Sequence, residues 1–106
     1  MAQVRVCFIS APRDISKALA HKLCEERLAA CVNIIPRIDS VYWWEDKLET
    51  DEESLLIIKT TQSKVEQLIN YVKDNHPYPV PEVIMLEVSE GLPDYLNWVA
   101  AETVKK

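Results

Sequence analysis

The feature that most constrains the fold is a long stretch of strand-like composition in the middle of a short chain. Residues 30–44 carry β-branched and aromatic side chains at alternating positions, and residues 48–50 and 55–60 supply a return strand. Because proline cannot donate a hydrogen bond within a sheet, we expect the first strand to bend or bulge at Pro36. Residues 45–47 have turn composition, so the segment predicts a hairpin far longer than the usual strand of about 5–6 residues.

The remaining elements follow from shorter patterns. Residues 4–9 and 83–88 are β-rich runs. Apolar residues at helical spacing predict a helix from an Asp14 N-cap to about Leu28, and a second one from a capping-box sequence at residues 63–66 to about Asn75. Pro93 suits the first turn of a last helix that ends near residue 103. The order β-α-β-β-α-β-α predicts an α+β domain of the ferredoxin-like kind, with an antiparallel sheet and helices on one face.

The predicted hairpin is too long for a chain of 106 residues to cover by itself. Apolar positions at residues 41–44 would face water in a monomer, and exposed apolar edges usually mark association surfaces. We therefore expect a closed homo-oligomer with strands paired between subunits. We predict that the large aromatic side chains lie in the core and the interface of this oligomer. The alternative is a stacking platform for a ligand. These residues are Tyr42, Trp43, Trp44 and Trp98.

Composition limits the partners of the chain. A net charge of −5, from 17 acidic and 12 basic residues, argues against nucleic acid, and the longest basic cluster is Lys105-Lys106. Acidic residues gather at 45–46, 49 and 51–53, which we interpret as a solvated loop that attracts cations without selecting them. No apolar run approaches the roughly 18 residues of a membrane-spanning helix, so no membrane partner is expected.

The cysteines and the N-terminus predict a cellular compartment. Three cysteines, Cys7, Cys24 and Cys31, are an odd number without the spacing of a disulfide framework. The N-terminus lacks a charged segment followed by a long apolar one, so no signal peptide is expected. Reduced thiols in a cytoplasmic protein are the expectation.

The usual signatures of an enzyme are missing from the sequence. A single glycine excludes a P-loop or a dinucleotide fingerprint, and neither CxxC nor HExxH occurs. His21 and Cys24 can share one helix face at i, i+3, but no glycine-rich turn follows to supply an oxyanion hole. We interpret this pair as a small buried thiol beside a solvent-facing histidine, and we expect no catalytic activity.

His76 is the strongest candidate for a metal ligand. It lies where a helix ends and a stiff segment with prolines at 77, 79 and 81 begins, so its ring is held in place. Cys7 or Ile9 on the first strand and Glu82 on the following loop are its expected neighbours. An imidazole with a thiolate or a carboxylate suits copper or zinc. The alternative is a histidine that bonds to backbone at a helix C-terminus.

Ordered motifs run along nearly the whole chain. They are Arg27-Leu28-Ala29-Ala30-Cys31-Val32-Asn33, Tyr42-Trp43-Trp44-Glu45, Lys47-Leu48-Glu49, Lys59-Thr60, His76-Pro77-Tyr78, Pro81-Glu82 and Tyr95-Leu96-Asn97-Trp98. Together they resemble the CutA family of divalent-cation tolerance proteins. The resemblance implies a single CutA-like domain over residues 1–106 and a homotrimer in which the long hairpin pairs across subunits. It also implies a PII-like architecture with small-ligand clefts between subunits, a link to copper tolerance, and no catalytic activity.

The resemblance also implies a copper site made of a cysteine on the first strand and two adjacent histidines. Carried over by position, the second histidine is His76, while Asn75 holds the place of the first and Ile9 that of the cysteine. Cys7 lies two residues earlier, about 7 Å along the strand. Asp46 stands where the family commonly has glycine, which we expect to cost little.

Two functional hypotheses follow. The first is a trimeric, cytoplasmic divalent-cation tolerance protein that binds Cu²⁺ or another divalent cation weakly through His76, Cys7 and Glu82. The alternative is a non-catalytic trimeric scaffold or signalling module that binds a small ligand or a protein partner in clefts between subunits.

Overall fold

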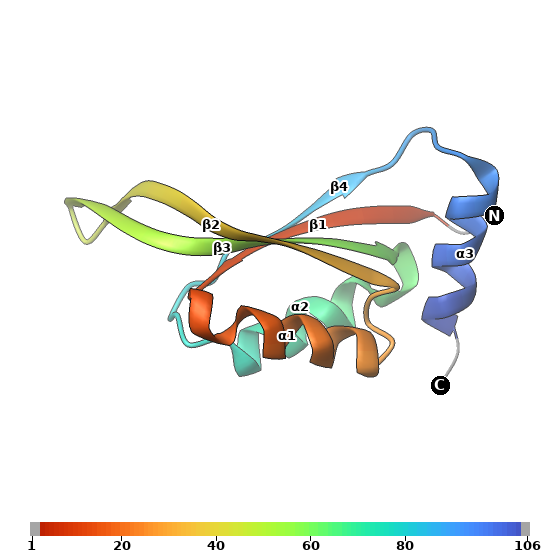
Figure 1. Ribbon diagram of the computed structural model, residues 1–106, viewed down its shortest axis with the longest axis horizontal. Coiled ribbons are helices and arrows are strands. Elements are labelled where there is room, and N and C mark those ends of the chain that lie inside the picture. Colours follow the sequence, from red (N-terminus) through yellow and green to blue (C-terminus); the bar gives the residue numbers. More distant parts are fainter. Residues whose placement is uncertain (1–2, 105–106) are drawn as a thin grey trace.

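A computed structural model describes residues 3–104; the basic cluster Lys105-Lys106 lies outside the described residues. One antiparallel sheet has the strand order β2-β3-β1-β4, and helices α1 and α2 cover one of its faces (Figure 1). The predicted α+β ferredoxin-like fold, with its long hairpin and C-terminal helix, is confirmed. The elements are β1 (Val4–Ala11), α1 (Arg13–Glu25), β2 (Cys31–Trp44), β3 (Lys47–Thr61), the 3₁₀ turn η1 (Gln62–Lys64), α2 (Val65–Asn75), β4 (Val83–Glu87) and α3 (Pro93–Val104).

The core lies between the sheet and its two covering helices. Side chains alternate along a strand, so every second residue of β1 and β3 faces the helices. The apolar face of each helix meets them there, and burying each large apolar side chain stabilises the fold by about 1.5–3 kcal/mol. The fully buried residues at this contact are Cys7, Ile9, Leu23, Leu56, Ile58, Leu68 and Val72.

The predicted irregularity of β2 at Pro36 is confirmed. Ile35 pairs with Leu55 and Ile38 with Glu53, so two residues of β2 oppose one residue of β3. The carbonyl of Pro36 accepts hydrogen bonds from Ser54 Oγ (2.9 Å) and from Arg13 Nε (3.1 Å). A bulge turns the strand locally, and these bonds hold the turned carbonyl in place.

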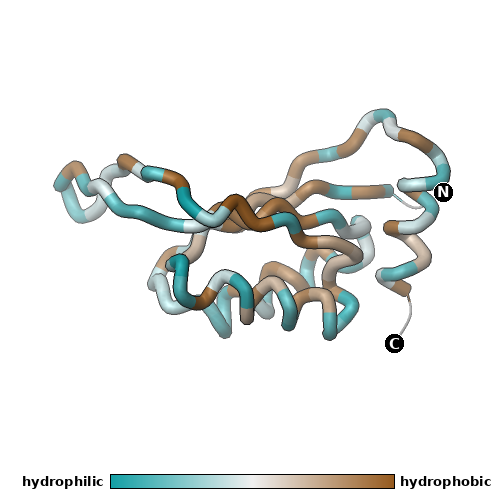
Figure 2. Tube along the Cα trace, in the orientation of Figure 1, coloured by the Kyte–Doolittle hydropathy of each residue, from teal (hydrophilic) through white to brown (hydrophobic). Residues whose placement is uncertain are grey.

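Beyond the bulge, the β2–β3 hairpin projects from the rest of the chain (Figure 1). Hydrophobic stretches continue along the projecting part, where the helices do not reach (Figure 2). Val41, Trp43 and Leu48 are 64%, 72% and 60% exposed. The acidic residues 51–53, which the sequence assigned to a loop, lie inside β3 instead. Their strand position follows from continuous pairing of Lys47–Glu53 with β2.

Helix ends differ from the sequence prediction. Helix α1 starts at Arg13 after Pro12, and Asp14 lies in its first turn, so it is not the N-cap. Ser63 lies in η1, and no side chain caps α2. The end of α1 at Glu25 comes three residues earlier than predicted. The cause is Arg27, which adopts a left-handed conformation (φ 59°) and ends the helix in a Schellman arrangement usually made by glycine.

None of the helices in residues 3–104 is long and apolar enough to cross a membrane.

Candidate functional site

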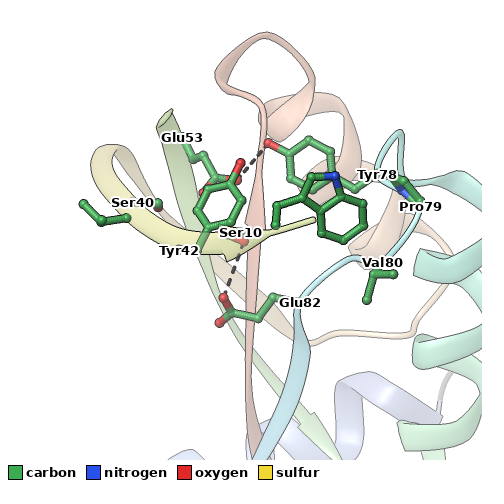
Figure 3. A pocket seen from close by; sticks show the side chains of 10 residues that line it. Ser10, Ser40, Tyr42, Glu53, Tyr78, Pro79, Val80 and Glu82 are labelled. Carbon is green, nitrogen blue, oxygen red and sulfur yellow. Dashed lines mark hydrogen bonds between the residues drawn. The ribbon is translucent and has the colours of Figure 1, made fainter. Parts of the chain in front are cut away.

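The candidate site is a cavity at the base of the hairpin. Strand β1 ends at Ala11, which pairs with Ser54, whereas β3 continues beyond it toward the hairpin turn. The segment 76–82, between α2 and β4, comes close to this point. A cavity of about 510 Å³ lies there, lined by side chains of β1, β2, β3 and this segment (Figure 3).

One face of the hairpin supplies most of the polar groups. Residues that oppose each other in an antiparallel pair point to the same face, so Ser40, Tyr42, Asp51 and Glu53 share one side. Alternation along β3 places Glu53 on the face opposite Leu56 and Ile58, away from the helices. The bulge and the register of β3 therefore determine which acidic residue enters the cavity.

Two carboxylates line the cavity. Glu53 is only 4% exposed, and its Oε2 accepts a hydrogen bond from the Tyr78 hydroxyl at 2.8 Å. Glu82 Oε1 accepts a longer bond from Ser10 Oγ at 3.5 Å. Within residues 3–104, neither carboxylate forms an ion pair with a lysine or arginine. Their negative charge meets only hydroxyl groups of the described chain.

The tyrosines beside these carboxylates remain protonated donors. Burial and the hydrogen bond to Glu53 raise the pKa of Tyr78 well above its ordinary value. The hydrogen bond from the Tyr42 hydroxyl to Asp51 is the main cause that raises the pKa of Tyr42 to about 12. Both phenols therefore donate to carboxylates throughout the neutral pH range.

His76 is held by two backbone groups next to this cavity. Its Nε2 bonds to the Ser10 carbonyl at 2.9 Å, and its Nδ1 accepts a hydrogen bond from the Tyr78 backbone N–H at 3.2 Å. A carbonyl can only accept and a backbone N–H can only donate, so these two bonds place a proton on Nε2 and a lone pair on Nδ1. The side chain is 8% exposed. This is the arrangement that the sequence left open as the alternative to a metal ligand.

Of the predicted partners of His76, Glu82 bonds to the same residue, Ser10, whereas Cys7 lies in the core. Cys7 is fully buried on the helix-covered face, and burial together with the charge of Glu82 raises the pKa of its thiol to about 12. The thiolate that a metal needs is therefore disfavoured. Asn75 donates its Nδ2 to the Tyr71 carbonyl at 2.8 Å.

Within residues 3–104, no three His, Cys, Asp or Glu side chains come together as metal ligands. These residues thus do not fit a preformed metal site within one chain, and binding through His76, Cys7 and Glu82 stays a prediction.

The pair of His21 and Cys24 lies in a separate open groove between α1 and β2. His21 is exposed, while Cys24 is half-buried, and burial raises the pKa of its thiol. A neutral thiol is a poor nucleophile. All three cysteines of the chain are free thiols.

Sequence reasoning missed Glu53, Tyr78 and Ser10 as members of one site. Glu53 stands in a run of three acidic residues, which is typical of a solvated segment. The available signal was strand alternation: position 53 shares its face with the half-buried Leu55 and Ile57 as well as with the exposed Asp51. Its contact with Tyr78 joins residues 25 positions apart and depends on tertiary structure.

The strand order, the two covering helices and the projecting hairpin define the class: a ferredoxin-like α+β protein with an extended hairpin. Residues 5–102 match the family model described as CutA1 divalent ion tolerance protein. The chain belongs to this CutA1 family.

Relatives of known structure have the same fold. The crystal structure of CutA1 from Oryza sativa has a TM-score of 0.91 at 48% identity and covers 94% of this chain and 93% of its own. A PII-like CutA from Nostoc sp. PCC 7120 has a TM-score of 0.89 at 29% identity over 93% and 96% of the two chains. The long hairpin and PII-like class are therefore shared with solved structures.

Curated relatives differ in length. "Divalent-cation tolerance protein CutA" of Thermus thermophilus is 42% identical over 99 residues, which cover 92% of this chain and 96% of that protein. "Protein CutA 1, chloroplastic" of Oryza sativa is 50% identical over 99 residues, but the match covers only 56% of its length. The chain thus spans little more than half of the plant protein and nearly all of the bacterial one.

Proposed function

We propose that this chain is a non-catalytic homotrimer that acts in divalent-cation tolerance and binds Cu²⁺ or another divalent cation weakly beside Ser10. Membership of the CutA1 divalent ion tolerance family supports the tolerance function. Similarity to PII-like CutA structures and the exposed apolar hairpin support assembly through the projecting strands. The three free thiols support a reducing compartment, and we propose the cytoplasm.

The observation that carries the cation site is the position of Ser10 between two ligand types. Its carbonyl holds the His76 imidazole, and its hydroxyl donates to Glu82. Imidazole and carboxylate are therefore held by the same residue at the end of β1. To bind a metal, His76 must release one of its two backbone partners, which costs a hydrogen bond and explains a low affinity. Cys7 could join only if its thiol left the core.

The test is a calorimetric titration of Cu²⁺ into the full chain, with the oligomer mass measured by light scattering in the same buffer. We expect one saturable site per chain, and we expect His76→Ala to weaken it at least tenfold while the trimer stays intact. His21→Ala is the matched control, because the other histidine is exposed and lies on α1. Equal loss in both variants, or no saturable site, would sink cation binding at His76.

The cavity favours a second candidate function. A trimeric scaffold or signalling module that binds a small ligand needs a concave site with aromatic walls and a few polar groups. The hairpin cavity has this character, with a volume of about 510 Å³ within the roughly 300–1,000 Å³ range of ligand pockets. If this is the function, His76→Ala leaves it unchanged, whatever the copper titration of that variant shows.

A further inference from the structure

The cavity at the hairpin base holds uncompensated negative charge. Glu53 is almost completely buried, yet its only hydrogen bond with the described part of the chain is the one that Oε2 accepts from Tyr78. Its Oε1 has no donor among the described residues. Every fully buried side-chain oxygen in residues 3–104 has a hydrogen-bond partner, so the unpartnered Oε1 is accessible from the cavity. A buried carboxylate normally has a cationic partner. Here the free acceptor faces a cavity instead.

A second carboxylate increases this negative charge. Glu82 lines the same cavity and, like Glu53, has no lysine or arginine partner within residues 3–104 (Figure 3). Asp51 adds a third negative charge through its contact with Tyr42. None of the lysines, arginines or histidines in residues 3–104 lines the cavity. The described chain therefore leaves this charge without a cationic side chain, and a cationic ligand would complement it.

The walls of the cavity are aromatic. Tyr42 and Trp44 from β2 and Tyr78 from the segment before β4 line it, together with aliphatic surface from Val41 and Val80. Aromatic faces attract weakly hydrated cations, and they gain little from a hard metal ion that keeps its water shell. A divalent metal also prefers several carboxylate or imidazole ligands around one point, and no such group of three exists in the described chain.

We propose that this cavity binds a small organic cation with N–H donors, of the guanidinium or primary ammonium class. A donor-bearing cation can hydrogen-bond to the free Oε1 of Glu53 and face Glu82, while its flat or alkyl part lies against the aromatic walls. A quaternary ammonium ion would leave the free oxygen of Glu53 without a donor. The inference deepens the second candidate function, the small-ligand module, and does not depend on copper binding through His76.

The experiment compares two ligands of the same shape and different charge. N-butylguanidinium and its neutral isostere N-butylurea are titrated separately into the full chain by calorimetry, at low ionic strength. We expect one saturable butylguanidinium site per chain and at least tenfold weaker binding of butylurea. Tetramethylammonium, a cation without donors, is expected to bind at least several-fold more weakly than butylguanidinium.

Two matched variants locate the site. Glu53→Gln keeps an oxygen that can accept from Tyr78 but removes the charge, and we expect it to weaken butylguanidinium binding at least tenfold. Glu90→Gln removes the same charge from an exposed loop position and should change the affinity less than twofold. Thermal unfolding of both variants checks the fold. The butylurea comparison on the unmodified chain tests the proposal even if Glu53→Gln is unstable.

Several results would overturn the proposal. These are the lack of a saturable butylguanidinium site, equal binding of butylurea, or unchanged affinity in Glu53→Gln. A Zn²⁺ titration separates the remaining alternative: Zn²⁺ binding that is lost in Glu53→Gln, without butylguanidinium binding, would assign the cavity to a metal. Copper binding through His76 can succeed or fail independently, because its test variants leave Glu53 in place.

Discussion

At the scale of single residues, the surroundings of a side chain decide its chemistry more than its type does. Glu52 and Glu53 are neighbours in sequence, but Glu52 pairs with Arg13 and Arg37 in solvent, whereas Glu53 is buried beside Tyr78. His76 looks like a metal ligand in the sequence, yet both of its ring nitrogens serve backbone groups. Alternation along β3 and the path of the 76–82 segment produce these differences.

The hairpin turn carries a conformational cost that a single substitution can remove. Glu45 and Asp46 have φ values of 50° and 63°, as a two-residue turn of this kind requires, and neither is glycine. We expect Asp46→Gly to raise the free energy of unfolding by about 0.5–1 kcal/mol, because glycine adopts this conformation without a Cβ penalty. Urea unfolding at fixed protein concentration measures the change. Asp46→Ala should instead destabilise the chain, and a less stable Asp46→Gly would contradict the turn assignment.

At the scale of elements, the bulge in β2 links the hairpin to α1. Ser54 Oγ donates to the Pro36 carbonyl and accepts from Ser16 Oγ at 3.2 Å, and Arg13 Nε donates to the same carbonyl. Ser16 and Ser54 are 3% and 1% exposed. This buried network holds the strand at the point where the hairpin leaves the sheet, and so it positions the cavity.

Two serine substitutions compare the buried network at Ser54 with the predicted helix cap at Ser63. Ser54→Ala leaves Ser16 Oγ and the Pro36 carbonyl with one partner fewer, and we expect it to lower the free energy of unfolding by about 1–2 kcal/mol. Ser63→Ala should cost less than about 0.5 kcal/mol, because Ser63 does not cap α2. Denaturant unfolding of both variants gives the comparison. A Ser63→Ala loss as large as that of Ser54→Ala would argue for the capping box after all.

At the scale of the whole molecule, the shape of the chain favours assembly. Its extents are 44 × 26 × 22 Å, and the long dimension includes the projecting hairpin (Figure 1). Trp43 opposes Leu48 in the β2–β3 pairing, and Val41 lies two residues away on the same face. Trp43 and Leu48 lie on the face opposite to Tyr42 and do not line the cavity, whereas Val41 does. Two surfaces of one hairpin can therefore serve assembly and ligand binding separately.

The proposed trimer can be tested on that apolar face. Light scattering should give about three times the 12.2 kDa chain mass for the unmodified protein. The double variant Trp43→Ser, Leu48→Ser should shift the mass toward a single chain, because it removes two of the most exposed apolar side chains of the hairpin. Ile69→Ser on α2, also partly exposed, is the control and should leave the mass unchanged. An unshifted mass in the double variant would exclude this face as the interface.

The sequence by itself determined the elements and their order. Alternating apolar residues specify the strands, and apolar residues at helical spacing such as Leu19 and Leu23 specify the helices, because these patterns depend only on local geometry. Pro36 predicted the bulge, because the missing backbone N–H of proline is a property of that residue alone. The ends of α1 and α2 were predicted less well, because Arg27 adopts a conformation normally reserved for glycine and Ser63 enters a 3₁₀ turn.

Only the tertiary structure decided the site. The contacts of Tyr78 with Glu53 and of His76 with Ser10 join residues 25 and 66 positions apart, and no local pattern encodes such distances. The cavity exists because β3 extends beyond the end of β1 at Ala11, and the segment after α2 passes beside the space that β1 leaves open. Which charges are buried, and which ring nitrogens are free, depends on that packing, because burial and hydrogen bonding are properties of neighbours in space.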